Sequence, residues 1–171
     1  MSSSVTHGLC IPYVVRATPN KGRGLFADAA IPKGTTVWRH VAGQYAVYDE
    51  RSLKALLSNL PDSEAVYVLT HIHCMPEFPD YMIWVLDDGE LINHSDQPTL
   101  LKQTRSGYNK CSPATSIKDV SAALLGDHFT LVAARDIEEA EELTLDYNDD
   151  PEDPKYYDAL CEQYGVKWDW L

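Results

Sequence analysis

The sequence predicts a mainly β fold with short helices. Short apolar runs alternate with Pro and Gly along most of the 171 residues. That pattern is typical of short strands joined by turns rather than of a helical bundle. Only two segments show the spacing of an amphipathic helix. The length fits one domain that can bury a core without disulfides or a structural metal.

The expected strands are short apolar segments bounded by turn residues. Their ranges are 13–16, 35–41, 81–86, 129–134 and 143–147. The sequence IPKG at 31–34 predicts a turn, because Pro fixes φ at the bend and Gly tolerates an unusual dihedral after it. The sequence DDG at 87–89 predicts a second turn.

Two helices are expected. In residues 49–60, four leucines fall on one helical face and Asp49 is available as the N-cap. The second helix begins with Asp153 as N-cap and Pro154 in the first position, and it ends at Gly165. Both apolar faces are expected to pack on the core. Residues 102–126 are polar and predict a mobile loop or insertion, with one helical turn near 119–125.

The formal net charge of −12 argues against nucleic acid as the main ligand and leaves basic proteins as plausible partners. The acidity is C-terminal, since residues 136–169 contain thirteen Asp or Glu against two Lys. A solvated acidic surface is the usual explanation for such a segment. Steering of a basic substrate is the alternative.

The cysteines predict neither a disulfide framework nor a zinc cluster. Cys10, Cys74, Cys111 and Cys161 lie far apart, without paired spacing. The HIHC sequence at 71–74 would place its side chains on alternating strand faces and lacks a distant partner pair, so no metal site is expected. No apolar run has the length of a membrane helix, and no signal peptide is evident. We therefore expect a soluble, intracellular chain, with nucleus or cytoplasm left open.

Three short motifs are the most informative part of the chain. They are GRGLFA at 22–27, LINHS at 91–95 and ELTLDY at 142–147. With ARDI at 134–137, they resemble the signature set of the SET-domain methyltransferases, which transfer a methyl group from S-adenosylmethionine to a lysine amine. The resemblance extends over about 11–147.

This resemblance implies a SET-domain fold of several small sheets with a threaded, pseudoknot-like C-terminal segment. The threading would bring the second and third motifs side by side. We expect a single SET-like domain over 1–171, with a motif core at about 11–147 and an inserted helix at about 49–60. A C-terminal helix and aromatic tail would occupy 153–171.

The first two motifs suggest a small-ligand site. Gly22 and Gly24 allow close backbone approach and Arg23 can meet a carboxylate, although a tight hairpin with an exposed Arg would explain the same residues. Asn93 offers both a donor and an acceptor for an amino-acid group. The resemblance implies that S-adenosylmethionine is the cofactor. Its methionine end would lie on Asn93 and on the turn Lys21, Gly22, Arg23 and Gly24, and its adenine on the backbone of His94.

The resemblance assigns the catalytic role to Tyr147, at the end of the third motif. His94 need not act as a base, because a histidine beside an apolar run is more often a satisfied structural residue. Trp168 and Trp170 are expected either to wall the substrate channel or stack on adenine, or to pack on the core.

The chain departs from the family pattern at several positions. Asp96 replaces a frequent Cys, Thr99 a common Asn and Ala140 the usual Gly of a turn. The cysteine-rich segment that follows Tyr147 in many histone-directed members is missing.

We therefore expect a protein-lysine N-methyltransferase that acts on histones or another basic protein. A catalytically weak or inactive SET-like module that binds cofactor or protein is the alternative, and a small-molecule methyltransferase is a third. No direct nucleic-acid or membrane binding is expected. The substrate lysine, the number of methyl groups and the oligomeric state are left open.

Overall fold

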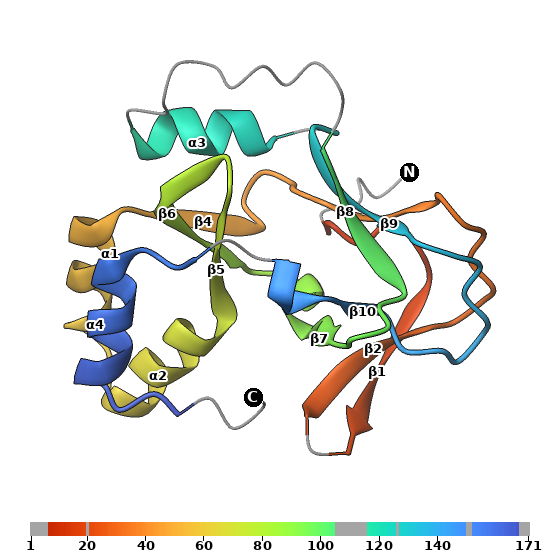
Figure 1. The fold of residues 1–171 in the computed structure, drawn as a ribbon, viewed down its shortest axis with the longest axis horizontal. Coiled ribbons are helices and arrows are strands. Elements are labelled where there is room, and N and C mark those ends of the chain that lie inside the picture. Colours follow the sequence, from red (N-terminus) through yellow and green to blue (C-terminus); the bar gives the residue numbers. More distant parts are fainter. Residues whose placement is uncertain (1–6, 20, 105–115, 126, 150–151, 168–171) are drawn as a thin grey trace, which may run out of the picture.

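The computed structural model describes residues 7–19, 21–104, 116–125, 127–149 and 152–167. These residues form small sheets and short helices in place of one continuous sheet (Figure 1). The mainly β fold with short helices that the sequence predicts is therefore confirmed.

Two of the sheets have two strands each. The antiparallel hairpin consists of β1 (Tyr13–Thr18) and β2 (Gly22–Ala27), and its register pairs Arg16 with Gly24. The other sheet pairs β7 (Asn93–His94) with β10 (Thr144–Leu145) in parallel. Such short parallel pairing joins segments that are about fifty residues apart in sequence.

The remaining two sheets have three antiparallel strands each. One has the order β3 (Thr36–Arg39), β9 (Phe129–Ala133), β8 (Leu100–Thr104). The other has the order β4 (Tyr45–Tyr48), β6 (Phe78–Val85), β5 (Ile72–Met75).

The helices cover the β4–β6–β5 side of the molecule (Figure 1). They are α1 (Glu50–Leu57), α2 (Asp62–His71), α3 (Ile117–Leu124) and α4 (Lys155–Gln163). Helices α1, α2 and α4 share an apolar cluster with β5 and β6, in which Leu53, Leu57 and Leu69 are fully buried. A separate cluster fills the space between the hairpin and the β3 sheet. Two 3₁₀ turns, η1 (Asp88–Leu91) and η2 (Tyr147–Asp149), flank the parallel strand pair.

The leucine spacing and the Asp49 cap predicted the position of α1 correctly. Asp49 is its N-cap and accepts from the amide of Ser52, whose hydroxyl in turn accepts from the amide of Asp49. This reciprocal pair satisfies two amides that the first helical turn leaves without partners. The expected stop of α4 is also confirmed, since Gly165 has φ of 66°.

Four expectations about local structure were wrong. Pro154, not Asp153, is the N-cap of α4, and it makes no side-chain cap. Residues 102–104 belong to β8 and not to the expected loop, whereas α3 over 117–124 confirms the helical turn expected near 119–125. His71 ends α2 and only 72–75 form a strand. Tyr147 begins η2 and does not end a strand.

Ala140, where the sequence departs from the family's glycine, has φ of 66°. A side chain makes the left-handed region unfavourable by roughly 1–2 kcal/mol. The turn is held regardless, because the amide of Ala140 donates to the Ala27 carbonyl at 2.8 Å.

We expect Ala140→Gly to raise the free energy of unfolding by about 1 kcal/mol, since it removes the Cβ strain at a small entropic cost. Urea denaturation would measure the change. The matched control is Ala30→Gly, because Ala30 is not among the residues with positive φ. Equal effects of the two substitutions would contradict the strain at Ala140.

His40 is buried among aromatic rings. Its ring lies 4.5 Å from that of Trp38 and 5.1 Å from that of Tyr45. Burial, assisted by the nearby His73, lowers the pKa of His40 to about 3. An interaction with the Phe129 backbone offsets part of this shift, but neither ring nitrogen has a partner with hydrogen-bond geometry in the described chain.

The free energy of unfolding should therefore fall as the pH drops below about 6.5, because the unfolded chain then protonates His40 and the folded chain does not. Between pH 7 and pH 5 the loss from this residue is about 2 kcal/mol. Urea titrations at both pH values should show a smaller loss for His40→Phe than for the parent. The same loss in both proteins would contradict the neutral, buried state of His40.

Candidate active site

The three sequence motifs meet at one junction. The segment just before β10 bonds to β2, since Leu143 N–H donates to Leu25 O at 2.8 Å and Ala27 N–H donates to Glu141 O at 2.9 Å. From the next residue, Thr144, the same segment pairs with β7. The expectation that the second and third motifs lie side by side is therefore confirmed (Figure 1).

Gly24 allows close contact between the first motif and the other two. A Cβ at this position would lie 2.7 Å from Asn93 Nδ2 and 2.6 Å from Glu142 Oε1. Asn93 Nδ2 donates to Glu142 Oε1 at 2.8 Å and to the Arg23 carbonyl at 3.1 Å. Both amide hydrogens of Asn93 are thus used within the protein, so the group that Asn93 can offer a ligand is its acceptor, Oδ1.

The ammonium of Lys21, the residue before the first motif, lies beside β7. Lys21 Nζ donates to the His94 carbonyl at 2.7 Å. Gly22, with φ of 72°, supplies the left-handed turn between Lys21 and Arg23. The predicted binding residues Lys21, Gly22, Arg23, Gly24, Asn93 and His94 are therefore brought together around one short strand.

Tyr147 is held at both ends. Its hydroxyl donates to the Ile92 carbonyl, and its amide donates to His94 Nδ1 at 3.1 Å. Because His94 Nδ1 accepts this bond, the neutral ring carries its proton on Nε2, which faces Asp96 Oδ1 at 3.2 Å. The imidazole of His94 is thus engaged in positioning Tyr147.

Thr99, a second departure from the family pattern, makes hydrogen bonds through both its hydroxyl and its amide. Its hydroxyl donates to Glu142 O and accepts from the amide of Thr144, while the Thr144 hydroxyl accepts from the amide of Thr99. Both threonines are buried. These bonds satisfy polar groups beneath the parallel strand pair, which fixes the position of β10 relative to the segment that follows β7.

A further neighbour of the junction, Tyr67 of α2, was not predicted from the sequence. Its hydroxyl donates to Glu90 of η1 at 3.0 Å, and its ring stacks on His71 with centroids 3.9 Å apart. Burial raises the pKa of Tyr67, as does the bond to Glu90, whereas the nearby Arg23 opposes the shift. Helix α2 was not predicted, because the apolar residues of 62–71 lack a regular helical stripe.

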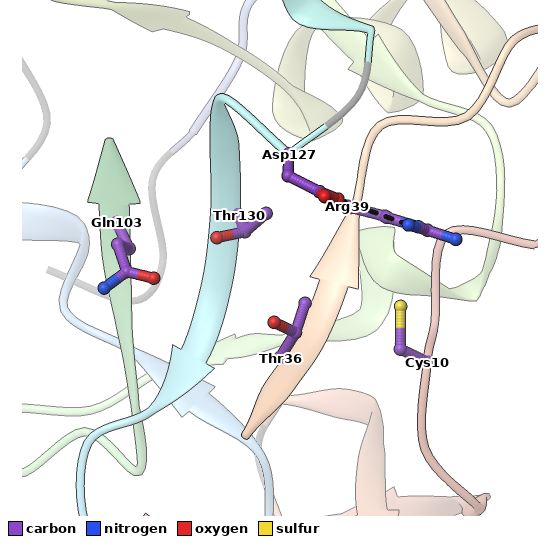
Figure 2. A pocket seen from close by; sticks show the side chains of 6 residues that line it. All are labelled: Cys10, Thr36, Arg39, Gln103, Asp127 and Thr130. Carbon is purple, nitrogen blue, oxygen red and sulfur yellow. Dashed lines mark hydrogen bonds and ion pairs between the residues drawn. The ribbon is translucent and has the colours of Figure 1, made fainter. Parts of the chain in front are cut away.

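A hollow of the described surface lies away from this junction. It measures about 450 Å³ and covers the outer face of the β3–β9–β8 sheet. Figure 2 shows the ion pair between Arg39 and Asp127 and the Cys10 thiol beside this hollow. Arg39 Nη1 lies 3.2 Å from Asp127 Oδ1. Burial is the main cause of the raised pKa of Cys10, so the thiol is a poor nucleophile near neutral pH. The lining does not include any of the predicted site residues.

Two predictions lie partly or wholly outside the described chain. Trp168 and Trp170 fall beyond residue 167, and Cys111 falls within 105–115. Among the described residues, Cys10, Cys74 and Cys161 form no disulfide, and no group of three or more potential metal ligands is found there. The absence of a metal site in the whole chain stays a prediction.

The small sheets around this junction, where three distant segments meet beside Lys21 and Tyr147, define a mixed β domain. A SET-domain sequence profile matches residues 22–148. The chain belongs to the SET-domain family.

Individual proteins are similar to this chain at lower identity. The N-lysine methyltransferase KMT5A-A of Danio rerio is 28% identical over 152 residues, which are 85% of this chain and 38% of that protein. The Neurospora SET domain protein DIM-5, a histone lysine methyltransferase, superposes with a TM-score of 0.55 at 18% identity over 86% of this chain and 56% of its own. KRYPTONITE, solved in complex with mCHG DNA and SAH, superposes with a TM-score of 0.50 at 22% identity. This match covers 81% of this chain and 24% of the KRYPTONITE chain.

The chain spans less than two fifths of the length of the KMT5A-A relative. At their identities the two solved structures support the fold alone. They therefore confirm the expected SET-domain fold, and the roles of single residues stay predictions.

We expect Gly24→Ala to disrupt this junction, since the added methyl group would overlap the Asn93 and Glu142 side chains. Overpacking of this kind costs roughly 1–3 kcal/mol. Urea denaturation would report the loss, and the side-chain amide signals of Asn93 in a ¹⁵N NMR spectrum should shift. Unchanged amide signals would show that the contact is looser than the structure indicates.

Proposed function

We propose that this chain is an S-adenosylmethionine-dependent protein-lysine N-methyltransferase. The observation that carries the proposal is the placement of Tyr147, held at its hydroxyl and its amide, next to the Lys21–Gly24 turn and Asn93. The name of the Danio rerio relative, an N-lysine methyltransferase, supports the same activity.

The residues of the junction fit the proposed cofactor. Lys21 and Arg23 can meet a carboxylate, and Asn93 Oδ1 can accept from an ammonium group. Ser95 N–H donates to Leu145 O, so strand alternation directs the N–H and C=O of His94 away from β10. That pair of groups matches the acceptor and donor edge of adenine. S-adenosylmethionine, when bound, supplies an activated methyl group on a sulfonium.

Tyr147 would orient the substrate amine. Its hydroxyl hydrogen is directed to the Ile92 carbonyl, so the phenol oxygen faces a substrate as an acceptor. An amine that donates N–H to this oxygen turns its lone pair toward the transferred methyl group. Alignment of this kind, with partial positive charge developing on nitrogen, is what the protein must add to an already activated methyl group.

The surroundings of Tyr147 favour a basic substrate. Asp146 and Asp96 both lie within 4 Å of the His94 ring. Together with the net charge of −12, they would attract a lysine-rich segment such as a histone tail or another basic protein. None of the described helices has the length and hydrophobicity to cross a bilayer. We propose an intracellular location, in either the nucleus or the cytoplasm.

The direct test is incubation with isotope-labelled S-adenosylmethionine and core histones or a mixed protein extract, followed by mass spectrometry of the labelled residue. Methyl-lysine in protein is the expected product. Cofactor binding without methyl transfer would favour a noncatalytic module. This is the second candidate function, because Asp96 and Ala140 replace residues that are usual in the family motifs. Label in low-mass material alone would favour a small-molecule methyltransferase.

We expect Tyr147→Phe and Asn93→Ala to separate binding from chemistry. Loss of the Tyr147 hydroxyl should lower single-turnover transfer at least tenfold, about 1.4 kcal/mol, with cofactor affinity nearly unchanged, because the interaction is strongest in the transition state. Loss of the Asn93 amide should weaken cofactor affinity about tenfold or more. Calorimetry and rapid-quench kinetics measure the two effects.

Tyr156→Phe is the matched control, because this α4 tyrosine donates to the Asp80 carbonyl, outside the junction. Its transfer rate should equal that of the parent. A Tyr147→Phe protein that transfers methyl groups as fast as the parent would contradict the proposed catalytic role. A folded Asn93→Ala protein that binds the cofactor as tightly as the parent would contradict the proposed binding site.

A further inference from the structure

Lys21 covers a backbone group that the proposed cofactor needs. Its ammonium lies 2.7 Å from the His94 carbonyl. Among the described residues Lys21 has no ion-pair partner, so its charge is not neutralised by a carboxylate of the chain. A carboxylate ligand would therefore compete well with the neutral carbonyl for this cation.

The His94 carbonyl is half of a donor and acceptor pair. Strand β7 pairs with β10 on one side, and the Ser95 bond to Leu145 shows which peptide groups point that way. The N–H and C=O of His94 belong to the opposite side. An adenine presents an acceptor nitrogen next to an amino donor, which matches this pair. The Lys21 ammonium uses one of the two lone pairs of this carbonyl, so it competes with the amino group for the acceptor.

We propose that Lys21 is a specificity-determining residue that couples adenine binding to the presence of a carboxylate on the same ligand. The inference rests on the proposed function, because it assumes that S-adenosylmethionine binds at this junction. The carboxylate of its methionine end draws Lys21 off His94 and thereby frees the carbonyl for the adenine amine. An adenine nucleoside without a carboxylate has to compete with Lys21 for the carbonyl without this compensation.

The coupling makes opposite predictions for two ligands. Without the Lys21 charge, S-adenosylmethionine loses a contact to its carboxylate, so the affinity of the protein for this ligand falls. The loss of this charge also frees the His94 carbonyl, so the affinity for a neutral nucleoside rises. A hydrogen bond of this kind corresponds to about threefold to tenfold in affinity. A lysine that merely binds the carboxylate would leave the nucleoside affinity unchanged.

The experiment compares the parent with Lys21→Met, which keeps the length of the side chain and removes its charge. Calorimetry measures the affinity for S-adenosylmethionine, and ligand-observed NMR titration measures that for methylthioadenosine, which lacks the amino-acid end. Lys33→Met is the matched control, since Lys33 is an exposed lysine of the 31–34 turn. Thermal melting checks that each variant is folded.

We expect Lys21→Met to bind S-adenosylmethionine about tenfold more weakly and methylthioadenosine about threefold more tightly. Lys33→Met should bind both ligands like the parent. Unchanged or weaker methylthioadenosine binding by Lys21→Met, with normal cofactor binding by the parent, would overturn the coupling and leave the proposed function standing. A parent protein that does not bind S-adenosylmethionine would overturn both.

Discussion

The buried carboxylate of Asp87 is the constraint on which the rest of the site depends. It is only 7% exposed and accepts from Gly8 N–H at 2.6 Å, Trp38 Nε1 at 3.0 Å and Gly89 N–H at 2.9 Å. A buried charge is tolerated only when donors surround it in this way. Asp87 also caps η1, so these bonds fix the turn that leads directly to Asn93.

Two aromatic donors from other elements also hold η1. Tyr13 of β1 donates to Asp88 at 2.8 Å, and Tyr67 of α2 donates to Glu90. The carbonyl that accepts the Tyr147 hydroxyl belongs to Ile92, immediately after this turn. The geometry of the proposed catalytic tyrosine is therefore set by contacts with β1, β3 and α2, none of which contains a catalytic residue. Such support by packed neighbours is what a preorganised site requires.

Much of the local structure could be predicted from the sequence, because its causes are local. The apolar spacing and the Asp49 cap specify α1, and Gly165 ends α4, whatever the rest of the chain does. Helix α2 was missed, because its burial is decided by α4 and the β6 sheet rather than by its own pattern. Thr99 and Ala140 appeared as departures from a motif, and only their contacts show how the chain accommodates them.

The sequence by itself determined the family, the small-sheet fold and the set of residues that meet at the junction, since three motifs in fixed order are a property of the chain. Tertiary structure alone decided how those residues are used. Both hydrogens of the Asn93 amide are used by Arg23 and Glu142, and Lys21 lies on the His94 carbonyl. The physical reason is that a hydrogen bond depends on the distance between atoms, and these partners lie about fifty to seventy residues apart along the chain.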